Sequence, residues 1–260
     1  MNEKHRRNTP APPAEEVEGQ REGRNALTEA LRSGRTLDKG FIASGETDKG
    51  LQRLAAQAKE TGAVVVPVDR RKLDAMSFTH AHQGVITLAA AHEYATIDDI
   101  LEEAANRGQA PLIVICDELT DPHNLGAIMR SAECAGAHGV IITTRRSVGL
   151  TATVAKASAG AVEYMKVARV TNINSAITEL KEKGVWIFGT AAEGSIPMYK
   201  ADLTGPAAIV IGNEGDGMSP LVRKNCDVTV SIPMQGRISS LNASAAASIL
   251  RYEAVRQRLG

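Results

Sequence analysis

AIVIGNEGDGMSPLVRKNCDVTVSIPMQGRISSLNAS, residues 208–244, is the stretch of this sequence that decides the fold. Two short apolar runs, 208–211 and 228–232, predict buried strands, and each is followed by a loop of small residues. In an open α/β sheet, ligands bind at the loops that leave the carboxyl ends of the strands. These loops carry a carboxylate, Glu214, a carboxamide, Asn242, and several hydroxyl groups. They therefore predict a small-molecule site.

Both loops are also explained as ordinary connections between a strand and a helix. Ser219 is a suitable N-cap with a proline directly after it, and Ser240 or Asn242 would cap the final helix. The glycine loop 212–217 contains neither the dinucleotide-binding pattern G-x-G-x-x-G nor the P-loop pattern. Those two nucleotide-binding classes are excluded, whereas a ligand site and simple helix caps both remain open.

The composition indicates a globular protein without an overall charge. The chain has 260 residues, 43% of them apolar, and its 30 basic and 30 acidic residues balance. No global field therefore favours nucleic acid. The cysteines Cys116, Cys134 and Cys226 are far apart in apolar surroundings, so we expect core thiols and no metal site. Because no apolar run could span a bilayer and the N-terminus lacks an apolar signal core, a cytoplasmic protein is expected.

Residues 17–90 predict a small α/β domain, which follows a polar tail, 1–16, that we expect to be disordered. Apolar residues at helical spacing alternate there with short strand-like runs such as 84–88. The basic residues of this domain concentrate in loops and first turns, where solvation and phosphate contacts explain them about equally well. His80 and His82 suggest a metal pair, but no carboxylate or thiol completes it, so a surface loop or an RNA contact is favoured.

Residues 110–260 predict a second domain, a doubly wound sheet of parallel strands. The run 112–116 is continuously apolar, as in a strand that is buried on both faces of such a sheet. Similar runs follow, and helical patterns separate them. The preceding segment, 91–109, is polar and acidic, and we expect a linker with a short helix around 97–105.

The segment after the first strand of this second domain contains two candidate functional residues. Asn124 is a suitable N-cap for the helix that follows. Arg130 lies six residues further on, close to the buried stripe of that helix. An arginine at such a position is rarely unpaired, which indicates either a structural ion pair or a functional cation at an oxyanion.

Three stretches resemble the motifs of the SpoU (TrmH) family, S-adenosylmethionine-dependent RNA ribose 2′-O-methyltransferases of the SPOUT superfamily. They are 124–130, 211–215, and 232–234 with 240–244, and they cover the second domain in order and spacing. The first domain resembles the substrate-binding domain that is similar to ribosomal protein L30e. This layout is similar to that of the RlmB group, the 23S rRNA guanosine-2′-O-methyltransferases.

The resemblance implies a C-terminal sheet with a deep trefoil knot, S-adenosylmethionine as the cofactor, and a homodimer. The cofactor residues that it implies are Thr190, Gly212, Ile232, Met234 and Leu241. It also implies a catalytic set in which Arg130 acts at the ribose oxygen and four others position it: Asn124, Glu214, Ser240 and Asn242.

The expected partner is structured RNA, with a guanosine of 23S rRNA as the target and no membrane or metal involved. RNA contacts are expected from basic residues of the first domain: Arg24, Arg35, Arg70, Arg71 and Lys72. Two alternatives remain open at this point. One is the same chemistry on tRNA or on an rRNA adenosine, and the other is a non-catalytic RNA-binding protein of ribosome assembly.

Overall fold

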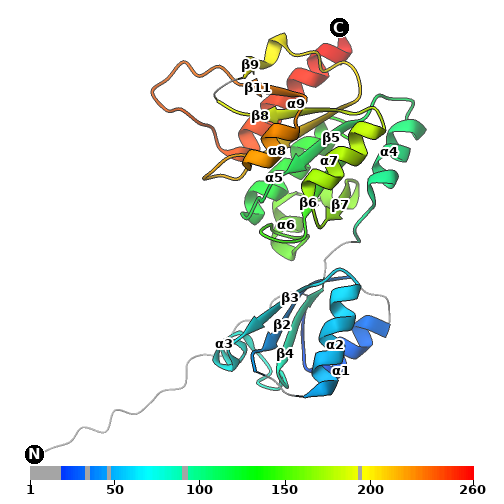
Figure 1. The fold of residues 1–260 in the computed structure, drawn as a ribbon, viewed down its shortest axis with the longest axis vertical. Helices are drawn as coiled ribbons and strands as arrows, with labels where there is room; N and C mark the ends of the chain where they lie inside the picture. The colour runs from blue at the N-terminus through cyan, green and yellow to red at the C-terminus, as the bar shows by residue number, and fades with distance from the viewer. Residues whose placement is uncertain (1–18, 33–35, 46–47, 90–92, 193–194) are drawn as a thin grey trace, which may run out of the picture. The chain divides into compact units, whose positions relative to one another are not determined.

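The computed structural model describes residues 19–32, 36–45, 48–89, 93–192 and 195–260 (Figure 1). The chain forms two compact units, Met1–Ala89 and Ala90–Gly260. The predicted tail and Arg35, one of the expected RNA contacts, lie outside the described residues.

The first unit is built on a four-stranded sheet with the strand order β1-β4-β2-β3. Its strands are β1 (Gln20–Glu22), β2 (Leu37–Ala43), β3 (Val64–Val68) and β4 (Val85–Ala89). Strands β2 and β3 are parallel, whereas β4 is antiparallel to both of its neighbours, β1 and β2. The α/β class predicted from the alternation of helical and strand-like segments is confirmed.

Helices cover both faces of this sheet (Figure 1). Helices α1 (Arg24–Arg32) and α2 (Lys49–Glu60) pack together and bury Leu27 and Leu51 with Val85 of the sheet. Helix α3 (Arg70–Met76) instead buries Leu73 with Ile86. Because neighbouring residues of a strand point to opposite faces, the α1–α2 pair and α3 lie on opposite sides of the sheet.

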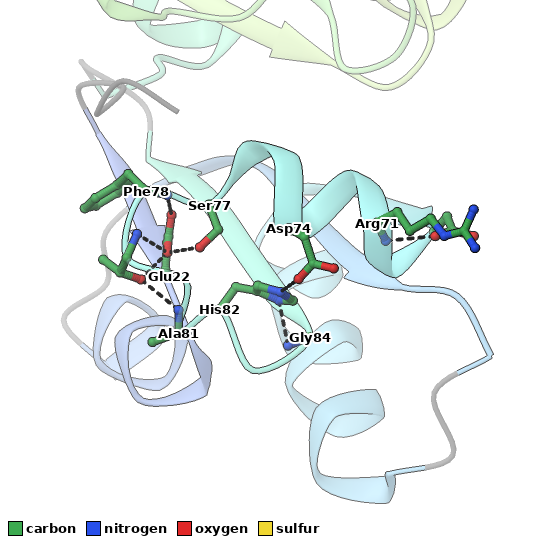
Figure 2. A network of polar contacts seen from close by, with 10 residues as sticks. Glu22, Arg71, Asp74, Ser77, Phe78, Ala81, His82 and Gly84 are labelled. Carbon is green, nitrogen blue, oxygen red and sulfur yellow. Dashed lines mark hydrogen bonds and ion pairs between the residues drawn. The ribbon is translucent and has the colours of Figure 1, made fainter. Parts of the chain in front are cut away.

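His82 is buried and takes part in a polar network, although residues 79–81 and 83 of the same loop are exposed (Figure 2). Its Nδ1 accepts a hydrogen bond from the Gly84 N–H (3.1 Å), which places the ring proton on Nε2. That Nε2 then donates to Oδ1 of Asp74 (2.9 Å). Helix α3 thus brings to His82 a carboxylate that the sequence did not indicate, although no group of three possible metal ligands forms among the described residues. His80 is exposed, as predicted, and has a left-handed backbone with a φ of 56°.

Glu22 fixes the start of the loop that joins α3 to β4, whereas His82 lies near its end (Figure 2). Its carboxylate accepts hydrogen bonds from the hydroxyl of Ser77 (2.6 Å) and the backbone N–H of Phe78 (2.8 Å). Partial burial alone would raise the pKa of this carboxyl. The hydrogen bonds from Ser77, Thr79, Phe78 and Gln20 outweigh burial and lower the pKa to about 2.

We expect the substitution Glu22→Gln to destabilise the first unit by about 1–3 kcal/mol at neutral pH, because hydrogen bonds to a charged acceptor are lost. A carboxyl with a depressed pKa stabilises the folded state above its unfolded pKa of about 4.3, and this contribution is lost as the pH falls towards 2. Urea unfolding at pH 7 and pH 3 should therefore give a large difference between variant and wild type at pH 7 and a smaller one at pH 3.

The control for this prediction is Glu29→Gln, which removes an exposed carboxylate from α1. It should change the free energy of unfolding by no more than about 0.5 kcal/mol at either pH. A Glu22→Gln effect that persists unchanged at pH 3 would show that the charge of Glu22 does not hold the loop.

The second unit is built on a seven-stranded sheet with the strand order β7-β6-β5-β10-β8-β11-β9. Every pairing in it is parallel. Its strands are β5 (Leu112–Cys116), β6 (Gly139–Thr143), β7 (Lys166–Val170), β8 (Trp186–Thr190), β9 (Ile196–Pro197), β10 (Ala207–Ile211) and β11 (Val228–Ser231). The predicted parallel α/β class is confirmed. Strand β10 lies between β5 and β8, which sets two loops distant in sequence side by side.

The central strand β5 is buried on both faces, as its apolar sequence predicted. Leu112, Val114 and Cys116 pack into one core cluster, whereas Ile113 and Ile115 pack into the other. The helices of this unit are α4 (Ile97–Asn106), α5 (Pro122–Cys134), α6 (Ala152–Ala157), α7 (Ile173–Glu182), α8 (Pro220–Asn225) and α9 (Ala243–Leu259), with short 3-10 turns at Ala161–Glu163 and Met198–Lys200. Among the described residues, no helix has the length and apolar character that crossing a membrane would require.

The sequence predicted a linker at 91–109. Helix α4 instead belongs to the second unit. Ile97 and Ile100 are buried in the same core cluster as Ile113 and Ile115 of β5, and Ala104 is also buried. The helix itself agrees with the prediction around 97–105. The polar and acidic composition was misleading, because those residues lie on the outer face of an amphipathic helix whose inner face is apolar.

The cysteines are less uniform than the sequence predicted. Cys116 is buried, Cys226 is half-buried and Cys134 is exposed, so the expectation of three core thiols is wrong for Cys134. Burial raises the pKa of Cys116 to about 12 and that of Cys226 to about 11. These two thiols are therefore protonated near neutral pH and are unsuited to act as nucleophiles.

Candidate functional site

Asn124 lies at the start of α5, but it does not cap the helix as predicted. The cap is Asp121, whose carboxylate accepts a hydrogen bond from the His123 N–H (2.9 Å). Pro122 occupies the first helical turn, where its fixed φ and missing N–H are favourable. Asn124 is consequently inside the first turn, and its buried side chain bonds to other segments of the chain.

A chain of hydrogen bonds connects the three motif stretches through Asn124. Its Nδ2 donates to Oε1 of Glu214 (2.8 Å), and its Oδ1 accepts from Nδ2 of Asn242 (2.9 Å). Oδ1 of Asn242 in turn accepts from the N–H groups of Ser244 (2.9 Å) and Ala245 (3.4 Å) and caps α9. Both amides are thereby fixed in orientation, because a flipped amide would oppose donor to donor. Asn242 is thus both a helix cap and a member of the site.

The carboxylate of Glu214 is exposed at the end of this chain of hydrogen bonds. Asn124 binds one of its oxygens, and the other oxygen has no hydrogen-bond partner among the residues that the structure describes. An ionised carboxylate accepts several hydrogen bonds. Glu214 therefore presents an oriented acceptor to whatever occupies this edge of the sheet.

The loop after β10 is tightly folded around Gly212. Asn213 and Gly217 exchange backbone hydrogen bonds of 3.0 Å, and Nδ2 of Asn213 donates to the carbonyl of Glu118 (2.9 Å). A Cβ atom at Gly212 would lie 2.2 Å from the backbone of Gly217, closer than real contacts allow. Glycine is therefore required here for close backbone approach.

Asp117 is a member of the site that the sequence interpretation did not single out. It follows β5 directly and is buried, and its carboxylate accepts a hydrogen bond from the Ser219 N–H (2.8 Å). This bond ties the end of the glycine loop to the end of β5. The available signal was an acidic residue placed immediately after a continuous apolar strand.

Three of the five predicted cofactor residues lie at the carboxyl ends of neighbouring strands. Thr190 ends β8, Gly212 follows β10 and Ile232 follows β11, and β8 lies between the other two strands. Since the strands are parallel, these residues share one edge of the sheet. Met234 and Leu241 are exposed on the loop that joins β11 to α9, with exposed fractions of 37% and 41%.

The structure does not place Arg130 and Ser240 in the hydrogen-bond chain. Met129 and Ala132 of α5 are buried, but Arg130 is exposed, so its predicted position close to the buried stripe is wrong. Its guanidinium has no hydrogen bond or ion pair with the described residues. The structural ion pair, one of the two roles considered for Arg130, is therefore not formed with them. Ser240 is also exposed and has no hydrogen-bonded side-chain partner in the described part of the chain.

The predicted RNA contacts of the first unit fall on opposite faces of its sheet. Arg24 begins α1 and forms an ion pair with Asp48 (2.5 Å), which caps α2. Arg70, Arg71 and Lys72 instead form the first turn of α3. The prediction grouped these residues by their charge alone. In the fold, α1 and α3 place them on opposite faces of the sheet.

The hydrogen-bonded groups of the site are arranged to bind and orient a ligand. In the described segments, no group of three or more histidine, cysteine, aspartate or glutamate residues could hold a metal ion. The site offers amides of fixed orientation, one exposed carboxylate and a tightly folded glycine loop. Such groups suit a polar organic ligand and a hydroxyl-bearing substrate.

Both units match families of known proteins. Residues 111–252 match the SpoU rRNA Methylase family, and residues 22–95 match the family described as RNA 2′-O ribose methyltransferase substrate binding. A relative from Bacillus subtilis (strain 168), YacO, is assigned to the TrmH family of tRNA/rRNA methyltransferases. It is 47% identical over 236 residues, which cover 91% of this chain and 94% of YacO.

Solved structures of methyltransferases are similar to most of the chain. The SpoU methyltransferase AviRb from Streptomyces viridochromogenes, in complex with AdoMet, is 26% identical with a TM-score of 0.59, and the match covers 93% of this chain and 91% of AviRb. An AdoMet-bound rRNA methyltransferase from Sinorhizobium meliloti is 25% identical with a TM-score of 0.59, covering 93% of this chain and 88% of that protein.

Proposed function

The chain belongs to the SpoU (TrmH) family of RNA methyltransferases, and on that premise we propose that it methylates a ribose 2′-hydroxyl of structured RNA, with S-adenosylmethionine as methyl donor. The hydrogen-bond chain Glu214–Asn124–Asn242 carries this proposal, because it assembles all three motif stretches into one site. The AdoMet bound in the two similar structures supports the choice of cofactor.

The carboxyl edge of the second sheet fits this cofactor. Thr190, Gly212 and Ile232 end neighbouring segments of this edge, and the close packing of Gly212 against Gly217 shapes the loop there. Met234 and Leu241 supply exposed apolar surface for the remainder of a ligand of this kind. When bound, the sulfonium supplies an already activated methyl group, so the protein has to align the acceptor hydroxyl and manage its proton and charge.

The residues of the site divide these tasks. A ribose hydroxyl is a weak nucleophile until its proton leaves, so the site must orient the ribose and stabilise the developing oxyanion. Asn124 holds Glu214 so that its second oxygen can accept a hydrogen bond from the RNA, and Asn242 holds Asn124. Ser240, which is outside this hydrogen-bond chain, is also proposed to position the ribose. Arg130 is the proposed cation at the oxyanion, because a guanidinium stays protonated near neutral pH and binds oxygens in pairs. Since a protonated guanidinium cannot accept the hydroxyl proton, a phosphate oxygen of the RNA is the proposed proton acceptor.

We extend the proposal to the target and the assembly. A guanosine of 23S rRNA is the proposed target. The alternative is tRNA or an rRNA adenosine, since the description of YacO names both tRNA and rRNA. A homodimer and a deep trefoil knot in the second unit are proposed with it. The parallel order β10-β8-β11, followed by α9, is compatible with such a knot.

The experiment that tests this function combines a cofactor titration with mapping of methylated riboses. Calorimetry with the full-length protein should show S-adenosylmethionine binding, and tritium from its methyl group should appear in 2′-O-methylguanosine of 23S rRNA. RNA from a strain lacking the gene should serve as the acceptor, since its target is unmethylated. If the folded protein binds RNA but no cofactor at millimolar concentration, it is a non-catalytic RNA-binding protein and the proposed reaction is wrong.

A further inference from the structure

The first unit has a groove between α1 and α2 that is lined by arginines. Its volume is about 600 Å³, and both helices contribute to its walls. The lining residues are Arg24, Thr28, Leu31 and Arg32 from α1 and Gly50, Arg53, Leu54 and Gln57 from α2. A cavity of several hundred Å³ accommodates a ligand the size of a nucleotide.

The lining follows from helical spacing on two packed helices. Thr28, Leu31 and Arg32 follow Arg24 by four, seven and eight residues and therefore share one face of α1. On α2, residues 50, 53, 54 and 57 share a face in the same way. Because α1 and α2 pack against each other, these two faces border one groove, a juxtaposition that neither helix shows alone.

The charges in the groove favour an anionic ligand. Arg24 is neutralised in part by Asp48, at 2.5 Å, and its Nε also donates to the carbonyl of Gln83 (3.3 Å). Arg32 and Arg53 are exposed, and neither forms an ion pair or hydrogen bond with the residues that the structure describes. Among the lining residues there is no aspartate or glutamate. Two guanidinium groups are thus available for oxygens outside the protein.

We infer that this groove binds the phosphate backbone of the RNA substrate, through Arg32 and Arg53 with Arg24 at its end. The inference rests on the proposed function, since it identifies where the substrate-binding unit holds RNA. Guanidinium groups bind phosphate oxygens in pairs. Leu31 and Leu54 offer apolar surface between them, and Gln57 and Thr28 offer polar groups for ribose hydroxyls.

The basic turn of α3 is less suited to this task. Arg70, Arg71 and Lys72 are consecutive, so their side chains point about 100° apart around the helix and do not converge. They also lie on the face of the sheet opposite to the groove. RNA that follows the groove on one face of the sheet therefore has no direct path across this turn.

The test compares charge-matched double variants of the full-length protein. Arg32→Gln with Arg53→Gln removes the two unpaired groove charges and leaves Arg24 and its ion pair intact. The control is Lys49→Gln with Lys59→Gln, which removes two exposed charges from α2 at positions that do not line the groove. The rival surface is tested by Arg70→Gln with Arg71→Gln. Binding of a 23S rRNA transcript is measured for each at several salt concentrations.

We expect the groove variant to lose about tenfold or more in RNA affinity, and its salt slope to become shallower by roughly 1.4 to 1.8, the value for two lost phosphate contacts. The KM for RNA should rise, while kcat at saturating RNA and the affinity for S-adenosylmethionine stay unchanged. The control should bind RNA as the wild type does.

Two results would contradict RNA binding in the groove. One is unchanged RNA affinity in the groove variant, and the other is a larger loss of RNA affinity in the α3 variant than in the groove variant. A different result separates this inference from the proposed reaction. If the wild type transfers no methyl group but its RNA affinity still depends on Arg32 and Arg53, the groove is supported and the proposed reaction is wrong.

Discussion

The substitution Arg130→Lys should lower the rate of methyl transfer by about 10² to 10³ and leave the stability of the protein nearly unchanged. Removal of one preorganised group that stabilises developing negative charge typically has an effect of this size. Lysine retains the positive charge but lacks the planar fork that holds two oxygens at once. Arg130 lies on α5, six residues and about 9 Å along the helix from Asn124, which anchors the hydrogen-bonded site.

The structure sharpens this prediction because it removes the main competing explanation. Glu214 is bound by Asn124, and Arg130 forms no ion pair with the described residues, so a lost structural pair cannot account for a slower reaction. Exposed side chains without partners usually change stability by less than about 0.5 kcal/mol when substituted. Single-turnover kinetics at saturating RNA and cofactor, together with the melting temperature, measure the two effects separately.

The matched control for Arg130→Lys is Arg107→Lys, the same chemical change at the end of α4. Arg107 pairs with Glu103 (2.8 Å), an exposed contact in which lysine can replace arginine. Its methyl transfer rate should equal that of the wild type. A near-normal rate for Arg130→Lys would remove Arg130 from the proposed catalytic residues.

The substitution Gly212→Ala should abolish cofactor binding and destabilise the second unit by about 1–3 kcal/mol or more. A Cβ at this position would lie 2.2 Å from backbone atoms of both Gly217 and Met218, so a side-chain movement cannot relieve the clash. The loop would have to open, which would break the hydrogen bonds between Asn213 and Gly217 and move Glu214 away from Asn124. Thermal unfolding and calorimetry with S-adenosylmethionine measure the two losses.

Gly215→Ala provides the control in the same loop. The nearest atom to a Cβ at Gly215 is Oδ1 of Asn213, at 3.4 Å, which is an ordinary contact. We expect its stability to lie within about 0.5 kcal/mol of the wild type and its cofactor affinity to be retained. Equal behaviour of the two alanine variants would mean that close packing at Gly212 is not what shapes the loop.

Local patterns in the sequence predicted most of the elements. The apolar runs at 112–116 and 208–211 became central strands because only residues without polar side chains can be buried on both faces of a sheet. Caps were predicted less reliably. Asn242 caps α9 as one of the two candidates, but Asp121 and not Asn124 caps α5, since Pro122 fixes where that helix begins.

The sequence by itself determined the α/β class, the three motif stretches and the residue types of the site, because each is encoded within a few neighbouring positions. Only the tertiary structure decided that Asn124 bonds to Glu214 and Asn242, that Asp74 accompanies His82, and that Arg32 and Arg53 share a groove. Except for Asp74 and His82, which are eight residues apart, the partners lie far apart in the chain or on different helices. Their proximity follows from strand order and from which apolar faces pack together, and no local periodicity specifies either.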